Sequence, residues 1–234
     1  MEKEALLKQI YHRLIVSCQA LEHEPLYRPE GGIMPLMAKA AQMSGAAGIR
    51  CNTVRDIKQI KEAVDLPIFG IIKKQYPPCP MHITVTMDEI DALHETGVDV
   101  IAYQGTSAIR PDGKTSAEFT AAIKEKYPDQ LIMADIATIE EALACEAAGA
   151  DFVSTTMRGY TPETKGIDDV DFDFIKELAQ KMTTAKVLVE GHVHYPEQAV
   201  RAMECGAYAV VVGGAITRPA EITARFTKAI SEKF

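Results

Sequence analysis

The chain has 234 residues, of which 47% are apolar, and a formal net charge of −8 at pH 7. This length suits one domain with a large core, and the acidic balance argues against a nucleic-acid partner, because nucleic acids bind basic surfaces. No apolar stretch approaches the length needed to cross a bilayer, and the charged segment 1–13 does not resemble a secretory signal, so we expect no membrane association. Five cysteines without a CxxC pair indicate reduced thiols and a cytoplasmic protein.

The chain opens with an expected helix over residues 1–13 and then repeats one pattern eight times. In each repeat a short apolar run, typical of a buried parallel strand, is followed by a segment with helical periodicity. Eight such units in this length predict an α/β protein with a (β/α)8 TIM-barrel fold, as a single domain over residues 1–234. The expected strands are residues 14–19, 46–50, 67–73, 100–104, 131–135, 152–156, 186–190 and 209–214.

Threonine residues mark the starts of three expected helices. Thr53 precedes one of them, and Thr86 and Thr138 are each followed three residues later by a glutamate, which is the spacing of a capping box. Gly149 marks the end of the helix that Thr138 begins. These signals support the division of the chain into strand–helix units.

Each apolar run has a polar residue or glycine at its C-terminal end. In a (β/α)8 barrel these ends face the active site, so the side chains there predict an enzyme. Three loops that follow strands, residues 22–35, 75–82 and 157–167, are candidate lids, with ordinary surface variation as the alternative. The residues at the strand ends are Gln19, Arg50, Lys73, Gln104, Asp135, Thr156, Glu190, Gly213 and Gly214.

Lys73 is the strongest candidate for a catalytic group, because burial at the end of an apolar strand costs a lysine its hydration. Partial burial lowers the pKa of an amine toward neutrality, which makes it a general base or a Schiff-base nucleophile. Glu190 and Asp135 are predicted on the same side of the barrel, as an acid/base set with Lys73 or as its ion-pair partners. Arg50 either binds a substrate oxygen or forms a packing salt bridge.

The segment VVVGGAITRP, at residues 210–219, predicts a phosphate site. Barrel enzymes often bind phosphate between the loops after strands 7 and 8. Gly213 and Gly214 allow backbone N–H groups to approach an anion, Arg218 supplies a charged contact, and Gly191 begins the partner loop. A tight turn with a surface arginine is the alternative.

The pattern Glu190-x-His-x-His superficially suggests a metal site, but no other histidine is expected at a strand end, so we expect no metal.

Seven segments, in order and with maintained spacing, resemble the bacterial N-acetylmannosamine-6-phosphate 2-epimerase family. They are LIVSCQALEHEPL, GIRCNTVRDI, PIFGIIKKQY, MADIATIEEA, STTMRGYT, VLVEGHV and VVVGGAITRP. The resemblance runs from about residue 14 to the C-terminus. It implies an isomerase without a cofactor that interconverts N-acetylmannosamine 6-phosphate and N-acetylglucosamine 6-phosphate in sialic acid and amino sugar catabolism, and it suggests a homodimer.

Position by position, the resemblance implies roles for the candidate residues. The catalytic lysine and glutamate fall on Lys73 and Glu190, and the reaction implied is deprotonation and reprotonation at C2 of the opened sugar. The substrate contacts fall on Gln19, Arg50 and Asp135, and the arginine on the phosphate side is Arg218.

Three positions depart from the family pattern. Gln104 stands where the family usually has an aspartate, His192 replaces an arginine or lysine, and Arg158 lies in the loop after strand 6. Gln104 and Arg158 are therefore predicted as substrate contacts that favour a more anionic sugar. This keeps open an epimerase, isomerase or lyase for a different phosphosugar on the same scaffold, or a sugar-phosphate sensor without catalysis.

Overall fold

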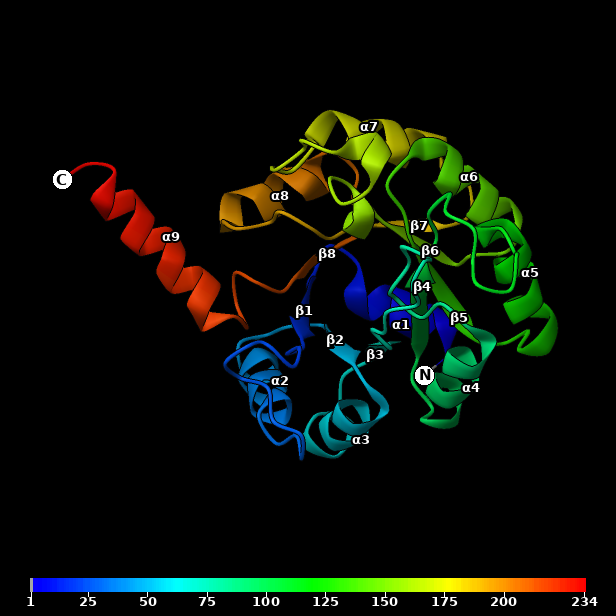
Figure 1. Cartoon of the computed structure of the whole chain (residues 1–234), viewed down its shortest axis with the longest axis horizontal. Helices are drawn as coiled ribbons and strands as arrows, with labels where there is room; N and C mark the ends of the chain where they lie inside the picture. Colours follow the sequence, from blue (N-terminus) through cyan, green and yellow to red (C-terminus); the bar gives the residue numbers. More distant parts are fainter. Residues whose placement is uncertain (1) are drawn as a thin grey trace.

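The computed structural model describes residues 2–234, in which eight parallel strands close into one barrel. Each strand pairs with its neighbour in chain order, and β8 returns to pair with β1 (Figure 1). This confirms the predicted (β/α)8 fold. The strands are β1 (Leu14–Cys18), β2 (Gly48–Asn52), β3 (Ile68–Ile71), β4 (Val100–Gln104), β5 (Leu131–Asp135), β6 (Phe152–Ser154), β7 (Lys186–Val189) and β8 (Ala209–Val212).

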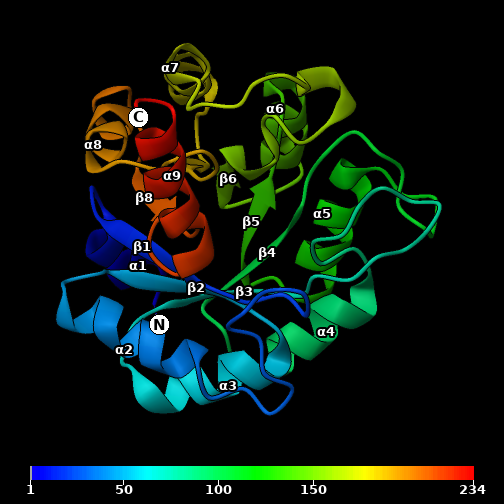
Figure 2. The same ribbon diagram turned by 60° about the vertical axis from the view of Figure 1, so that its left-hand side comes forward.

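Helices follow the strands and cover the outside of the barrel (Figures 1 and 2). The predicted capping boxes are present, since Glu89 accepts from the backbone N–H of Thr86 at 3.2 Å and Glu141 from that of Thr138 at 3.0 Å. Two short 3-10 turns, Thr155–Met157 and Pro162–Thr164, follow β6. The helices are α1 (Lys3–Ile10), α2 (Met34–Met43), α3 (Val54–Ala63), α4 (Met87–Glu95), α5 (Ser116–Lys126), α6 (Ile139–Ala147), α7 (Phe172–Lys181), α8 (Pro196–Glu204) and α9 (Pro219–Ser231).

The barrel interior is apolar at one end and polar at the other. Inward-facing residues recur at every second position of a strand, and the lower ones, such as Phe69 and Phe152, pack edge to face with ring centroids 6.0 Å apart. Higher in the barrel the buried residues are polar and include Ser17, Arg50 and Asp135. The period of two therefore gathers polar groups at the C-terminal end of the barrel.

Helix α1, which the sequence predicted within residues 1–13, closes the apolar end of the barrel. Leu6 and Ile10 are fully buried in the same cluster as the barrel interior. The hydroxyl of Tyr208 donates to the carbonyl of Leu7 at 3.0 Å and ties the helix to the turn before β8. Within residues 2–234, no helix is both long and apolar enough to span a membrane.

Helix α9 differs from the other helices that follow strands, because it extends away from the barrel (Figure 1). None of its residues is buried. Phe226 and Ile230, which share one face of the helix, are 66% and 60% exposed. By contrast, α7 buries Phe174, Ile175 and Leu178.

Several strand boundaries differ from the predicted ones. Strand β2 ends at Asn52 rather than Arg50, because both polar side chains point into the barrel and are buried there. Strand β3 ends at Ile71, so Lys73 lies two residues beyond it. The prediction took the first polar residue after each apolar run as the end of the strand. This rule fails where the polar side chain is buried in the barrel and finds hydrogen-bond partners there.

Candidate active site

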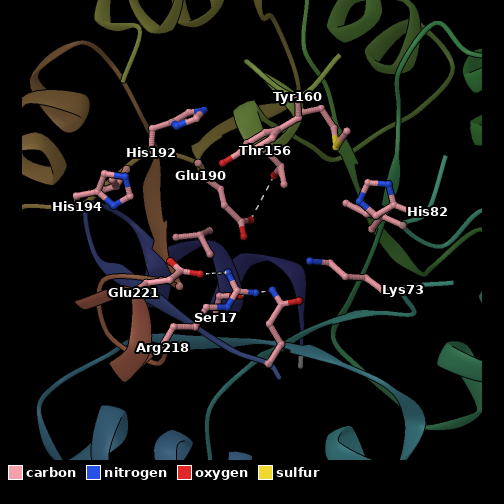
Figure 3. Close-up of a pocket in the computed structure, with 18 residues that line it drawn as sticks. Ser17, Lys73, His82, Thr156, Tyr160, Glu190, His192, His194, Arg218 and Glu221 are labelled. Atoms are coloured by element: carbon pink, nitrogen blue, oxygen red, sulfur yellow. Dashed lines mark hydrogen bonds and ion pairs between the residues drawn. The ribbon is translucent and has the colours of Figure 1, made fainter. Parts of the chain in front are cut away.

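A cavity of about 280 Å³ opens at the polar end of the barrel (Figure 3). It has the placement expected for the active site of this fold. Seven predicted site residues line it, namely Gln19, Lys73, Glu190, Gly191, Gly213, Gly214 and Arg218. Its wall also contains Thr156, which was expected at a strand end, and His192, which departs from the family pattern. Prediction from sequence did not assign site roles to the other polar residues of the wall, which are Ser17, His82, Tyr160, His194 and Glu221.

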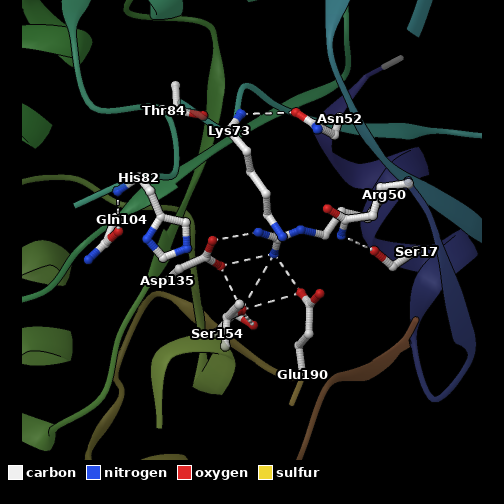
Figure 4. Close-up of polar contacts among 12 residues, drawn as sticks. Ser17, Arg50, Asn52, Lys73, His82, Thr84, Gln104, Asp135, Ser154 and Glu190 are labelled. Carbon is white, nitrogen blue, oxygen red and sulfur yellow. Dashed lines mark hydrogen bonds and ion pairs between the residues drawn. The ribbon is translucent and has the colours of Figure 1, made fainter. Parts of the chain in front are cut away.

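A buried ion-pair cluster lies beside the cavity (Figure 4). Arg50, 1% exposed, binds Asp135, 0% exposed, through two hydrogen bonds of 2.9 and 2.5 Å. The same guanidinium contacts Oε2 of Glu190 at 2.5 Å, and Thr156 donates to Asp135 at 2.7 Å. Arg50 and Asp135 do not line the cavity in this structure. Arg50 thus forms the buried salt bridge that was the alternative to a direct substrate contact.

The cluster sets the protonation of Glu190 and Arg50. Burial disfavours the charged form of Arg50, but Asp135 and Glu190 outweigh it and raise its pKa. Burial, reinforced by the negative charge of Asp135, raises the pKa of Glu190 although Arg50 and Lys73 oppose this. Glu190 therefore lies at the cavity wall as a carboxyl group that takes up a proton more readily than an exposed glutamate.

A short hairpin beyond β3 aims Lys73 into the cavity toward this cluster (Figure 4). Its backbone N–H donates to Oδ1 of Asn52 at 2.9 Å, and Lys73 forms a bridge with Ile83 on the returning segment. Burial, with the positive charge of Arg50, lowers the pKa of Lys73 to about 8. The exposed Lys74 points elsewhere, over the ring of Tyr76.

His82 is a part of the site that the sequence did not predict. It lies on the returning segment of the hairpin and faces the cavity close to Lys73 (Figure 3). Burial and the charge of Lys73 lower the pKa of His82. No local signal marks this residue, because it reaches the site only when the segment folds back along residues 72–74.

Gln104 is buried and does not line the cavity. Its Oε1 accepts from the backbone N–H of His82 at 3.0 Å, and its amide nitrogen donates to Thr106 at 3.0 Å. Its own carbonyl accepts from the buried Arg110. Gln104 therefore holds the segment that carries His82.

Arg158 lies behind the cavity wall rather than in it. Its guanidinium donates to Asp171 at 2.7 Å and to the carbonyl of Ala137 at 3.0 Å, and it lies 4.0 Å from the ring centroid of Phe174. These contacts satisfy the positive charge that was expected near the substrate.

Gln19 has one unsatisfied atom at the cavity wall. Its amide nitrogen donates to Oγ of Ser17 at 2.8 Å, while its buried Oε1 has no hydrogen-bond partner. A buried acceptor without a partner is costly, so the atom is suited to a hydroxyl or amide N–H of a ligand.

The predicted phosphate residues Gly191, Gly213, Gly214 and Arg218 line the same cavity, and Arg218 lies across it from Lys73 (Figure 3). Thr217 ties the glycine turn to β1 by donating to the carbonyl of Ser17 at 2.7 Å. Gly191 has a φ of 97°, which favours glycine, and it sets the facing loop. Arg218 is held by Glu24, with 2.5 Å between Nε and Oε1.

The Glu190-x-His-x-His pattern does not converge on one point. The ring of His192 stacks on Tyr160, with centroids 4.9 Å apart, and its Nε2 lies 3.2 Å from the carbonyl of Arg158. His194 lies 3.5 Å from Arg225. Across residues 2–234, no three His, Cys, Asp or Glu side chains are grouped so that they could hold a metal ion.

Comparison with known proteins identifies close relatives. Residues 34–232 match the family described as "Putative N-acetylmannosamine-6-phosphate epimerase". The chain is 48% identical to a protein of Caldanaerobacter subterraneus subsp. tengcongensis, over 97% of this chain and 95% of the relative, and 49% identical to one of Borrelia garinii subsp. bavariensis, over 97% and 98%. Both are called "Putative N-acetylmannosamine-6-phosphate 2-epimerase".

Solved structures agree with this. The N-acetylmannosamine-6-phosphate 2-epimerase from Clostridium perfringens superposes with a TM-score of 0.90 at 45% identity, over 96% of each chain. A thiamine phosphate pyrophosphorylase from Pyrococcus furiosus, with a TM-score of 0.63 at 16% identity, shares the fold alone.

Proposed function

Because this chain belongs to the N-acetylmannosamine-6-phosphate epimerase family, we propose that it interconverts N-acetylmannosamine 6-phosphate and N-acetylglucosamine 6-phosphate by proton exchange at C2. The observation that carries the proposal is Lys73, whose pKa is lowered to about 8, in a cavity whose far end holds the glycine turn and Arg218. This arrangement suits a phosphorylated sugar. Its phosphate group binds at the far end, and its C2 atom lies next to the amine of Lys73.

The reaction begins with opening of the sugar ring, because C2 is acidic only next to a carbonyl group at C1. Glu190 exchanges the proton of this step at the ring oxygen or O1, and its raised pKa suits it to hold that proton. The buried Arg50 holds the Glu190 carboxylate through the 2.5 Å contact. Arg50 thus fixes the position of the acid/base group.

Lys73 then removes the proton from C2. The C2–H bond breaks, its electron pair moves toward C1 to form an enolate, and the proton goes to Nζ of Lys73. Return of a proton to the opposite face of C2 gives the epimer. Oε1 of Gln19 accepts a hydrogen bond from the substrate, since it is buried at the cavity wall without another partner.

In this proposal the phosphate group is bound by Gly191, Gly213, Gly214 and Arg218. These contacts supply binding energy at a distance from C2. Gln104 acts indirectly, by holding His82 beside Lys73. Asp135 acts through Arg50. The reaction takes place in the cytoplasm, which agrees with the five cysteines being free thiols.

Proton NMR in D₂O with EDTA tests the proposed reaction. Purified protein incubated with N-acetylmannosamine 6-phosphate is expected to form N-acetylglucosamine 6-phosphate with deuterium at C2, because the abstracted proton exchanges with solvent. If the folded protein produced no epimer, or produced one that kept the C2 hydrogen throughout, the proposal would be wrong.

The pH profile gives an independent prediction. Only the neutral amine of Lys73 accepts a proton, and its pKa is lowered to about 8. Below that value, each unit of pH reduces the neutral fraction about tenfold. We therefore expect kcat/KM to rise with pH and level off above about pH 8. A kcat/KM that did not change between about pH 6 and about pH 8 would contradict Lys73 as the base.

A homodimer is the assembly proposed for this chain, with α9 as the contacting element. Phe226 and Ile230 form an exposed apolar face on a helix that buries none of its residues in its own barrel. A helix with an unburied apolar face is stabilised when a second copy covers it.

Light scattering coupled to size exclusion measures the assembly. We expect twice the 25.6 kDa mass of one chain. The double substitution Phe226→Glu with Ile230→Glu is expected to shift the protein to the single mass, because it places charges in the contact. Lys228→Glu, on the opposite face of the helix, is the control and should leave the mass unchanged. A monomeric wild-type protein would contradict the proposal.

A further inference from the structure

Glu221 places a carboxylate at the phosphate end of the cavity. It lies in the first turn of α9 and lines the cavity together with Gly213, Gly214 and Arg218 (Figure 3). Its side chain is 46% exposed, so it is free to move without disturbing the core. The phosphate site as predicted from sequence contains no acidic group.

The carboxylate of Glu221 contacts two of the groups that are proposed to hold the phosphate. Oε2 packs directly against Gly214, where an added Cβ atom would overlap it. Oε1 lies 3.3 Å from Nη1 of Arg218. A phosphate group bound to the same glycine and arginine has to enter the same small region.

Before any substrate binds, the carboxylates around Arg218 offset its positive charge. Glu24 contacts the guanidinium on one side at 2.5 Å and Glu221 on another, so two carboxylates face one positive charge. Arg225 is a second cation near this end, and it is directed at the carbonyl of Gly214 at 3.4 Å and at His194 at 3.5 Å. A phosphate dianion therefore meets a site that is not positively charged overall.

Glu24 and Glu221 differ in what they can do. The side chain of Glu24 is 15% exposed and also accepts from the backbone N–H of Leu21 at 2.5 Å, so it is fixed and holds Arg218 in place. Glu221 is more exposed, at 46%, and contacts Arg218 at the longer distance of 3.3 Å. Of the two carboxylates, Glu221 is the one that a phosphate group can displace.

From this geometry we infer that Glu221 occupies part of the phosphate position in the empty site, and that substrate binding displaces it. Glu221 is thereby a specificity-determining residue that weakens binding of the phosphate group and eases its release. The inference rests on the phosphate site of the proposed function. Because the phosphate end is remote from C2, the effect falls on binding of substrate and transition state alike, and so on KM rather than kcat.

Titration calorimetry with inorganic phosphate at about pH 8, where it is a dianion, tests the inference on the full chain. Glu221→Gln keeps the shape of the side chain and removes its charge. We expect the Kd for inorganic phosphate to fall about tenfold, because one negative charge next to a dianion is lost. The KM for N-acetylmannosamine 6-phosphate should fall by a similar factor with kcat unchanged, and binding of unphosphorylated N-acetylmannosamine should not change.

Glu197→Gln is the matched control. Glu197 lies in the first turn of α8, so its substitution removes the same charge from the same part of a neighbouring helix, outside the cavity. Its phosphate affinity should equal that of the wild type. The inference would be overturned if Glu221→Gln bound inorganic phosphate as weakly as the wild type or more weakly. It would also be overturned if neither the wild type nor Glu221→Gln bound inorganic phosphate.

Failure of the proposed function would look different. If the wild type bound inorganic phosphate but did not convert N-acetylmannosamine 6-phosphate, the proposed reaction would be wrong. The tenfold comparison between the wild type and Glu221→Gln would still decide the role of Glu221.

Discussion

Replacing Lys73 with alanine is expected to reduce turnover at least about a thousandfold, which corresponds to about 4 kcal/mol of activation free energy. The substitution removes the amine whose pKa is lowered to about 8 and leaves the Arg50–Asp135–Glu190 cluster in place. Because Lys73 is held by its backbone contacts to Asn52 and Ile83, the hairpin should keep its course. Turnover is measured by the NMR assay, and folding by thermal unfolding.

The adjacent lysine provides the control for this prediction. Lys74→Ala removes the same side chain from the next position, where it is exposed and directed away from the cavity. Its turnover should stay close to that of the wild type. Lys73→Ala that retained substantial activity would remove Lys73 as the base, and an equal loss in both variants would indicate damage to the hairpin instead.

Replacing Arg50 with methionine is expected to lower the free energy of unfolding by about 3–5 kcal/mol near neutral pH. Arg50 is 1% exposed and is the cation between Asp135, 0% exposed, and Glu190. Methionine fills a similar volume but leaves two buried carboxylates without their counter-charge, and that desolvation dominates the effect. Turnover should fall as well, because Glu190 loses the contact that fixes it.

Denaturant unfolding at two pH values checks the cause of this loss. A buried carboxyl group costs less when it carries a proton, so the destabilisation should be smaller at about pH 5 than at about pH 8. Arg28→Met is the comparison, since Arg28 pairs with Glu30 at 3.3 Å and both side chains are exposed, at 61% and 67%. That change should cost no more than about 1 kcal/mol. Equal losses in the two variants would show that the buried cluster contributes no more than a surface pair.

Elements with strong local signals were predictable from the sequence. Thr86 with Glu89 and Thr138 with Glu141 gave correct helix starts, because a capping box is satisfied within four residues. The Gly213–Gly214 turn and Arg218 were predicted together and line the same cavity. Lys73 and Glu190 could be placed there because the ends of consecutive parallel strands meet on one face of a barrel.

Contacts that depend on distant segments were not predictable in this way. His82 reaches the site only because its segment folds back along residues 72–74. Gln104 was expected to contact the substrate, but its side chain instead accepts a hydrogen bond from the backbone N–H of His82 and holds that segment. Arg158 was expected near the mouth of the barrel, yet Asp171 and Phe174 on the next helical unit hold it behind the wall. Glu221 looks like an ordinary helix-start glutamate until α9 brings it against Gly214.

By itself the sequence determined the eight-stranded barrel, the family to which the resemblance pointed, and the set of strand ends from which the site is built. These depend on hydrophobic period, capping residues and motif order, which are properties of neighbouring residues. The tertiary structure alone decided which polar groups face the cavity and which are paired behind it. A charged or polar side chain near the barrel mouth turns to whichever partner satisfies it, and that partner, such as Asp135 for Arg50, is 85 residues away in the chain.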